Sequence, residues 1–182
     1  MPDLLAAQDI LEALRELADE LGPGPARHTL VLAGGSVMAL HGLRAATRDV
    51  DCVAQLDKEL KAAAGRVGQR RGLEPGHWLN ASAAAWRPQT LHEADCQVVL
   101  DHPRLLVLGA PLRQVFLMKL VSLRVRDADD LAVLWPHAGF ATPEQAVAAL
   151  YGQAYPGEEP DEHLADFLRA KLVSAAVIRD AP

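Results

Sequence analysis

The sequence predicts an α/β fold of the α+β kind: a small mixed β-sheet with flanking helices and a helical C-terminal part. Four short apolar segments that resemble strands all precede residue 110, whereas helical spacing of apolar residues dominates from residue 111 onward. The strands and helices do not alternate regularly, which disfavours a doubly wound sheet. We therefore expect one domain over 1–182, with a sheet-containing core over 1–110 and a helical part over 111–182.

The first half of the chain supplies most of the predicted sheet. Apolar residues at helical spacing predict a helix that stops at Gly22-Pro23, and "HTLVLA" predicts a buried strand closed by Gly34-Gly35. A short helix from Ser36 to about His41 should follow, and then, after a loop, a second strand, "DVDCVA". Asp57 is placed to cap the next helix, which should end near residue 72.

The remaining elements follow from turn and capping signals. The segment 73–90 carries no clear pattern beyond one short helix after Asn80, and "DCQVVL" and "RLLVLGA" predict a hairpin. A long helical segment from residue 111 should break near Val125 to Asp127. Thr142 begins a capping box with proline at the first helical position, and a last helix should run from about Asp161 to Ile178.

Composition and charge limit the classes of partner. Half of the residues are hydrophobic and the formal net charge is −6, which disfavours a broad nucleic-acid-coating surface but leaves room for a local basic groove. No apolar stretch approaches the length of a membrane span and no signal pattern opens the chain, so we expect a cytoplasmic protein with no membrane partner. Cys52 and Cys96 lie in apolar runs and are expected to be buried, reduced thiols.

Two carboxylates and a glycine turn form the chemical signal of the sequence. Asp49 and Asp51 should project from one face of a strand, about 7 Å apart along the chain. Paired carboxylates suit magnesium, which also takes substrate phosphate oxygens as ligands. Gly34-Gly35-Ser36 lies at a strand-to-helix turn, where backbone N–H groups can approach an anion. Together these features predict a nucleoside triphosphate (NTP) site.

These motifs resemble a known family. Gly-Gly-Ser followed after about a dozen residues by Asp-hydrophobic-Asp is similar to the signature of the polymerase-beta-like nucleotidyltransferase superfold. "RAATRDVD" resembles the version found in bacterial minimal nucleotidyltransferases related to type IV abortive-infection toxins. "GHWLN" and "FLMKLVSLRVRDADDLAVL" are similar to later segments of that group, so the resemblance covers most of residues 30–135.

The resemblance implies a nucleotidyltransferase fold and a magnesium-dependent transfer of NMP from NTP to an acceptor hydroxyl. It implies triphosphate contacts at Gly34, Gly35 and Ser36, magnesium ligands at Asp49 and Asp51, phosphate contact by Lys119, and a downstream acid at Asp127 or Asp130. Arg44 and Arg48 are expected to engage substrate phosphates or the two carboxylates. It further implies a toxin that acts on tRNA, with a cognate antitoxin. The net acidity fits tRNA poorly, so protein and small-molecule acceptors remain open.

The sequence also departs from the family pattern. Classical members carry a third carboxylate on a later strand, but "LLVLGA" carries no acid, Asp101 is expected at a turn, and Asp95 precedes its strand. Either Asp127 or Asp130 supplies the acid, or catalysis is impaired. Two alternatives follow: a nucleotide-binding or protein-interaction module that has lost turnover, and an antibiotic-modifying nucleotidyltransferase with an acidic acceptor pocket.

Structural roles compete with each of these functional ones. The glycine pair could serve as a tight turn, and Arg44 or Arg48 could simply neutralise the aspartates. Asp127 could cap a helix while Arg126 pairs with Asp130. Lys119 either extends to the surface or reaches a site. For Trp78 and Trp86, packing in the core or under a lid is favoured over base stacking.

Overall fold

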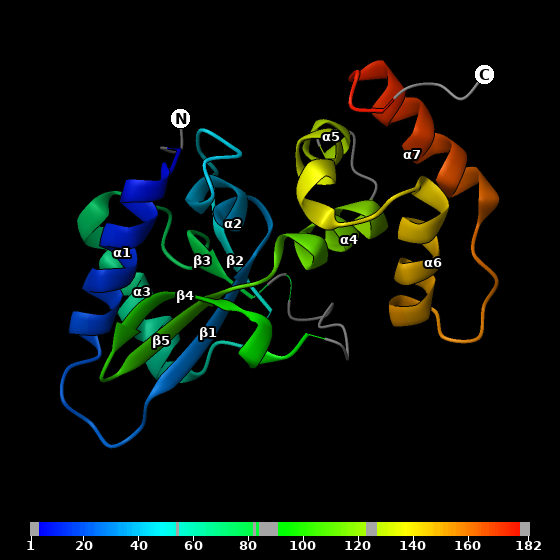
Figure 1. The fold of residues 1–182 in the computed structure, drawn as a ribbon. Coiled ribbons are helices and arrows are strands. Elements are labelled where there is room, and N and C mark those ends of the chain that lie inside the picture. Colours follow the sequence, from blue (N-terminus) through cyan, green and yellow to red (C-terminus); the bar gives the residue numbers. More distant parts are fainter. Residues whose placement is uncertain (1–3, 54, 82, 84–90, 123–126, 179–182) are drawn as a thin grey trace. The chain divides into compact units, whose positions relative to one another are not determined.

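The computed structural model describes residues 4–53, 55–81, 83, 91–122 and 127–178. These residues form two compact units, with the boundary between Pro111 and Leu112. The first unit contains a five-stranded mixed sheet with three helices, and the second contains four helices among its described residues (Figure 1). The predicted mixed α/β class is confirmed.

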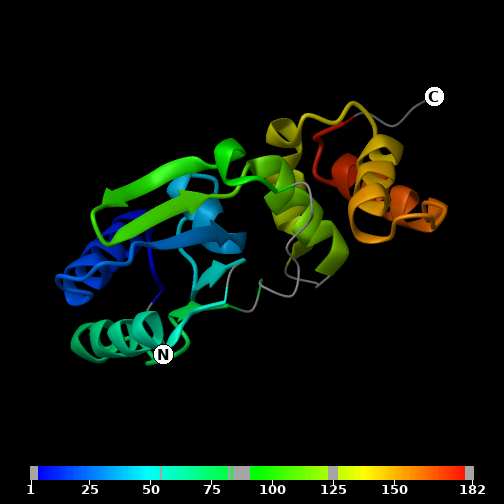
Figure 2. The same ribbon diagram turned by 90° about the horizontal axis from the view of Figure 1, so that it is seen from below.

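The sheet has the strand order β3-β2-β1-β5-β4. Its strands are β1 (His28–Ala33), β2 (Val50–Cys52), β3 (Leu79–Asn80), β4 (Gln97–His102) and β5 (Leu105–Gly109). β1 is antiparallel to β2 and parallel to β5, β3 is parallel to β2, and β4 forms a hairpin with β5 (Figure 2). The four predicted strands are all present, although β2 is shorter than expected, and β3 lies in the segment left unassigned by pattern.

The central strand explains why its sequence is so apolar. The last four residues of β1 are all buried, because the strand has a neighbour on each side and a helix packed on it. A continuous apolar run is the pattern expected for a strand that is buried on both faces. The turn that follows β1 is therefore fixed to a rigid part of the molecule.

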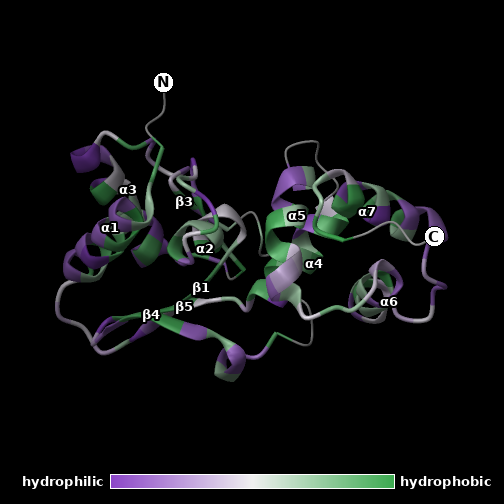
Figure 3. Ribbon diagram, turned by 45° about the horizontal axis from the view of Figure 1, so that its top comes forward, coloured by the Kyte–Doolittle hydropathy of each residue, from purple (hydrophilic) through white to green (hydrophobic). Residues whose placement is uncertain are grey.

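Three helices lie on the same side of the sheet in the first unit (Figure 3). They are α1 (Ala7–Glu20), α2 (Gly34–Leu40) and α3 (Lys58–Arg71). α1 buries Ile10, Leu14 and Leu17 as one apolar stripe. As predicted, Asp57 caps α3 by accepting a hydrogen bond from the N–H of Leu60, and Gly72 ends it in the left-handed conformation.

Ion pairs join α1 to the C-terminal end of α3. Arg66 and Arg70 both contact Glu20. Arg71 contacts Glu12 at 3.2 Å and Glu16 at 2.8 Å. These arginines are therefore engaged with carboxylates of the same unit.

A second charged cluster holds the start of β1 to the start of α3. His28 contacts Asp57 at 3.0 Å through Nδ1 and Glu59 at 2.9 Å through Nε2, and only 9% of its side chain is exposed. Arg104 donates to Glu59 at 2.8 Å and to the carbonyl of Ala26 at 2.7 Å. Because both carboxylates can only accept when ionised, the cluster depends on their staying charged.

This cluster predicts a loss of stability in acid. The Leu60 N–H and the charge of His28 hold the pKa of Asp57 below its ordinary value of 3.8, and hydrogen bonds from Arg104 and His28 lower the pKa of Glu59 from 4.5. A lowered folded-state pKa gives stability that is complete above the ordinary value and is lost as pH falls through the folded-state pKa. We therefore expect urea midpoints to fall more steeply in wild type than in Asp57→Asn as the pH drops below the ordinary Asp57 pKa of 3.8. Identical pH profiles would contradict this role of Asp57.

The second unit consists of α4 (Leu112–Ser122), α5 (Asp127–Ala138), α6 (Pro143–Ala154) and α7 (Glu162–Ser174). α4 ends at Ser122 and α5 begins at Asp127, and the break expected near Val125 to Asp127 falls mostly on residues 123–126, which lie outside the described part. Thr142 caps α6 by accepting from the N–H of Gln145, with proline at the first turn. Phe116, Trp135 and Phe140 pack together, with centroids 5.7 to 6.4 Å apart.

Several further sequence expectations can be compared with the structure. Cys52 is buried and Cys96 is half-buried, and neither forms a disulfide, so burial is confirmed for Cys52 only. Trp78 is buried, as expected for core packing, and its indole N–H donates to the carbonyl of Ala64 at 2.8 Å. Trp86 and the short helix expected after Asn80 fall largely outside the described residues. Within the described chain, each helix is too short or too polar to cross a membrane.

Candidate functional site

The glycine turn stands at the end of β1, where α2 begins. Gly34 has φ of +64°, a conformation that side chains with a Cβ rarely adopt. A Cβ at Gly34 would lie 2.8 Å from Oδ2 of Asp51. Glycine is therefore required here for two reasons: the backbone conformation disfavours a residue with a Cβ, and the Asp51 carboxylate leaves no space for one.

The loop between α2 and β2 folds back over the second glycine. A Cβ at Gly35 would lie 2.6 Å from Oγ1 of Thr47 and 3.3 Å from Nη1 of Arg44. Thr47 is fixed by paired backbone hydrogen bonds with Leu5 of 2.7 and 2.9 Å, and Arg44 Nε donates to the carbonyl of Ala46 at 3.1 Å. The structure thus brings the predicted residues Gly35 and Arg44 together, with Thr47 packed against the same glycine.

Ser36 has a structural task within the turn. It is fully buried, and its hydroxyl donates to the carbonyl of Ala33 at 2.8 Å. Of the three residues in the turn, Gly34 is half-buried, while Gly35 and Ser36 are buried. The Ser36 hydroxyl therefore stabilises the conformation of the turn. Of the three turn residues, Gly34 is the one that solvent or a ligand can reach.

The two predicted carboxylates lie at the start of β2. Asp51 is half-buried and pairs in register with Ala33 of β1 on one side and with Asn80 of β3 on the other. Asp49 directly precedes the strand and is also half-buried. The charge of Asp51 adds to the effect of burial in raising the pKa of the Cys52 thiol to about 12, so this thiol stays protonated.

Asn80 is a site residue that the sequence did not single out. It lies beside Asp51 in a parallel pair of strands, so the two side chains share one face of the sheet. Its Nδ2 donates to the carbonyl of His77 at 3.3 Å. Amide oxygens are hard ligands that suit magnesium, so Asn80 adds a third oxygen donor beside the carboxylates. The sequence offers Asn80 only as the last residue of "GHWLN", and its place beside Asp51 depends on the pairing of a two-residue strand.

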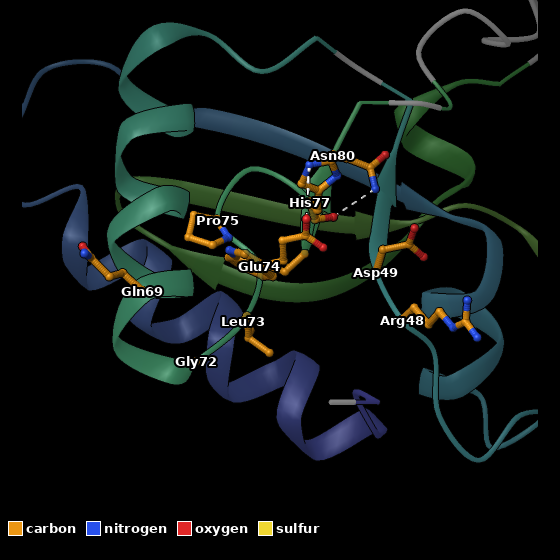
Figure 4. Close-up of a pocket in the computed structure, with 10 residues that line it drawn as sticks. Arg48, Asp49, Gln69, Gly72, Leu73, Glu74, Pro75, His77 and Asn80 are labelled. Atoms are coloured by element: carbon orange, nitrogen blue, oxygen red, sulfur yellow. Dashed lines mark hydrogen bonds and ion pairs between the residues drawn. The ribbon is translucent and has the colours of Figure 1, made fainter. Parts of the chain in front are cut away.

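A cavity of about 640 Å³ adjoins these residues. Its walls come from the C-terminal end of α3, the loop over 73–78, and the side chains of Arg48, Asp49 and Asn80. Figure 4 shows Asp49, just before β2, and Asn80, on β3, at one side, with Glu74 and Pro75 across from Arg48. Asp49 therefore borders a space large enough for a small molecule.

The other predicted residues gather in the second unit. Nζ of Lys119 lies 2.7 Å from Oδ1 of Asp127 and 2.7 Å from Oδ2 of Asp130. Ser122 donates to the other oxygen of Asp127 at 2.6 Å. Lys119 does not extend to the surface, since its residue is only 8% exposed. This cluster joins α4 to α5, and the expected pair of Arg126 with Asp130 lies outside the described residues.

The other carboxylates considered for catalysis take different positions. Asp101 lies within β4, not at the expected turn; it is exposed and pairs with Arg27. Asp95 ends a short 3-10 turn, Glu93–Asp95. Among the described residues, no group of three or more His, Cys, Asp or Glu side chains is arranged to hold a metal ion. A magnesium ion on Asp49 and Asp51 would therefore need oxygen ligands from elsewhere, such as Asn80, water and phosphate.

The contact between Gly34 and Asp51 can be tested by substitution. We expect Gly34→Ala to destabilise the protein by about 1–2 kcal/mol through backbone strain alone, and by more because the new methyl group displaces Asp51. Gly22→Ala is the matched control, because Gly22 has φ of +60° and a Cβ added there would meet nothing within 4 Å. Urea unfolding of the two variants separates strain from contact. Equal losses would show that Asp51 tolerates the methyl group.

No protein-family model, curated protein or solved structure matches this chain. The assignment of a function therefore depends on the arrangement of residues at the turn, on β2 and around the cavity.

Proposed function

We propose that this chain is a magnesium-dependent nucleotidyltransferase that moves NMP from NTP to an acceptor hydroxyl. The observation that carries the proposal is the contact of the Asp51 carboxylate with the glycine turn at Gly34. A magnesium ion held by this carboxylate would lie close to the backbone N–H donors of the turn, as an NTP–magnesium complex needs. The Gly-Gly-Ser and Asp-Val-Asp resemblance supports the same assignment.

Each residue has a definite task in this proposal. Asp49 and Asp51 would hold magnesium, which when bound neutralises charge on the phosphates. Arg44, beside Gly35, supplies a cation at the turn. Asn80 would offer its amide oxygen beside Asp51. Lys119, Asp127 and Asp130 keep their predicted roles as a phosphate contact and downstream acids, and the tRNA acceptor and the antitoxin partner also remain predictions.

The transfer is a single in-line displacement. The acceptor oxygen forms a bond to the α-phosphorus while the bond from that phosphorus to the bridging oxygen breaks, and pyrophosphate leaves with the electron pair. The acceptor proton passes to solvent. Because the transition state is loose in most analyses, positioning and charge stabilisation contribute more than a strong base. This chemistry is compatible with an amide in place of a third carboxylate.

A module that binds NTP without turnover is the second candidate. It is favoured by the amide of Asn80, which stands in register with Asp51 where an acid could have activated the acceptor. Such a module would bind NTP with magnesium and release no pyrophosphate.

Calorimetric titration with ATP, GTP, CTP and UTP, with and without magnesium, tests the shared basis of both candidates. We expect at least one NTP to bind only when magnesium is present. If the folded protein binds no NTP, or binds it equally well without magnesium, the proposal is wrong.

A further inference from the structure

The cavity and the glycine turn lie on opposite sides of the strand that carries the carboxylates. In the order β3-β2-β1, Asp51 has Ala33 of β1 on one side and Asn80 of β3 on the other. The turn continues from β1, whereas Asn80 and Asp49 line the cavity. None of the three turn residues is among the described cavity lining. A molecule in the cavity would thus approach the carboxylates from the side away from the turn.

If the proposed function is correct, the geometry of the transfer gives the β3 side of β2, where the cavity lies, a role in binding the acceptor. An in-line displacement places the incoming oxygen opposite the departing pyrophosphate. Pyrophosphate would lie toward the glycine turn, because the backbone N–H groups of the turn and the guanidinium of Arg44 attract its negative charge. The acceptor hydroxyl would then come from the β3 side, where the cavity is.

The charge around the cavity limits what can enter. Glu74 and Asp49 contribute negative charge, and the C-terminal end of α3 adds a partial negative charge through the helix dipole. His77 lies 3.7 Å from Glu74. The neighbouring Arg70 and Arg71 are engaged by carboxylates of α1. Arg48 is the one arginine or lysine of the described lining, and Figure 4 shows it across the cavity from Glu74 and Pro75. An acceptor with several phosphate groups would therefore bind weakly in this cavity.

The uncharged part of the lining suits hydroxyl groups. The amides of Gln69 and Asn80 each carry donors and an acceptor, as a polyhydroxylated molecule requires. Leu73 and Pro75 supply apolar contact. A volume of about 640 Å³ lies in the range of small-molecule sites.

We propose that this cavity binds the acceptor, and that the acceptor is an uncharged, hydroxyl-bearing small molecule of the nucleoside or sugar class, in place of the tRNA that the family resemblance implies. One hydroxyl of this molecule attacks the α-phosphorus, pyrophosphate departs, and the hydroxyl proton is released to solvent. Asp49 borders both the cavity and the metal site, so the reacting groups meet at this residue.

Solution NMR can test the proposal with paired probes: adenosine against AMP, and glucose against glucose 6-phosphate. The reporters are the imidazole of His77 and the side-chain amides of Gln69 and Asn80. We expect an uncharged probe to shift these resonances, its phosphorylated partner to bind about fivefold or more weakly, and the two pairs to distinguish a nucleoside from a sugar. Gln69→Trp, which fills the cavity, should abolish the shifts, whereas Lys61→Trp, on the exposed surface of the same helix, should retain them.

Four results would overturn the proposal. Phosphorylated probes that bind as well as their partners would show a site for phosphate-bearing acceptors, including RNA ends. If none of the probes binds, the acceptor is not an uncharged nucleoside or sugar. Shifts caused by magnesium-ATP alone would assign the cavity to the nucleotide's own nucleoside. If probes bind but no NTP binds anywhere by calorimetry, the proposed function fails and the acceptor role fails with it, whereas NTP binding without probe binding rejects this inference alone.

Discussion

Asp51→Asn is expected to remove magnesium-dependent NTP binding while leaving the protein folded. The substitution takes away a charged oxygen ligand, so affinity should fall by more than the roughly 10–100-fold typical of a lost outer-shell partner. Asp49→Asn should act in the same direction. Because asparagine matches aspartate in size and shape, both variants should remain folded.

The control for this prediction is Asp101→Asn, which removes an exposed carboxylate from another strand of the same sheet. It should bind NTP as wild type does. Calorimetry and thermal unfolding of the three variants provide both measurements. Unchanged NTP affinity in Asp51→Asn, or an equal loss in Asp101→Asn, would contradict the assignment of the metal ligands.

Lys119→Met is expected to destabilise the protein by about 3–5 kcal/mol, because it removes the cation that contacts both the buried Asp127 and the half-buried Asp130. Lys119 lies 2.7 Å from both Asp127 and Asp130, and their side chains are 7% and 13% exposed. Urea unfolding followed by circular dichroism measures the loss. Since α4 and α5 share this cluster, the second unit should unfold first.

Two further variants separate the charge imbalance from the loss of a lysine in general. Lys119→Met combined with Asp127→Asn and Asp130→Asn should recover much of the lost stability, since no buried charge is then left without its partner. Lys171→Met, a half-buried lysine of α7 in the same unit, should change stability by less than about 0.5 kcal/mol. If Lys119→Met alone is as stable as wild type, Lys119 does not stabilise the cluster with Asp127 and Asp130.

The parts of the fold that could be predicted are those that local sequence determines. β1 and β5 are apolar runs with turn residues beside them, and the caps at Asp57 and Thr142 act within one helical turn. β3 could not be predicted, because two residues carry no periodicity and only pairing with β2 makes them a strand. Asp101 was misplaced for a related reason: β4 continues to His102, past the point at which the apolar pattern stops.

The candidate site was predictable in its members more than in its geometry. Spacing along one strand and a turn identified Gly34, Asp49 and Asp51, since their relation is local. Asn80 and Thr47 join them only through tertiary contacts: strand pairing for one, and the fold of a loop over Gly35 for the other. Lys119 shows the same limit, because its partners Asp127 and Asp130 lie on another helix, α5.

The most direct measurement is manganese binding, followed by electron paramagnetic resonance, with Mn²⁺ in place of magnesium. We expect wild type to bind Mn²⁺ more tightly when ATP is present, because phosphate oxygens complete the ligand set. The Asp49→Asn/Asp51→Asn double variant should lose this binding with and without ATP. Equal Mn²⁺ binding by wild type and the double variant would contradict the site on β2 and, with it, the proposed function.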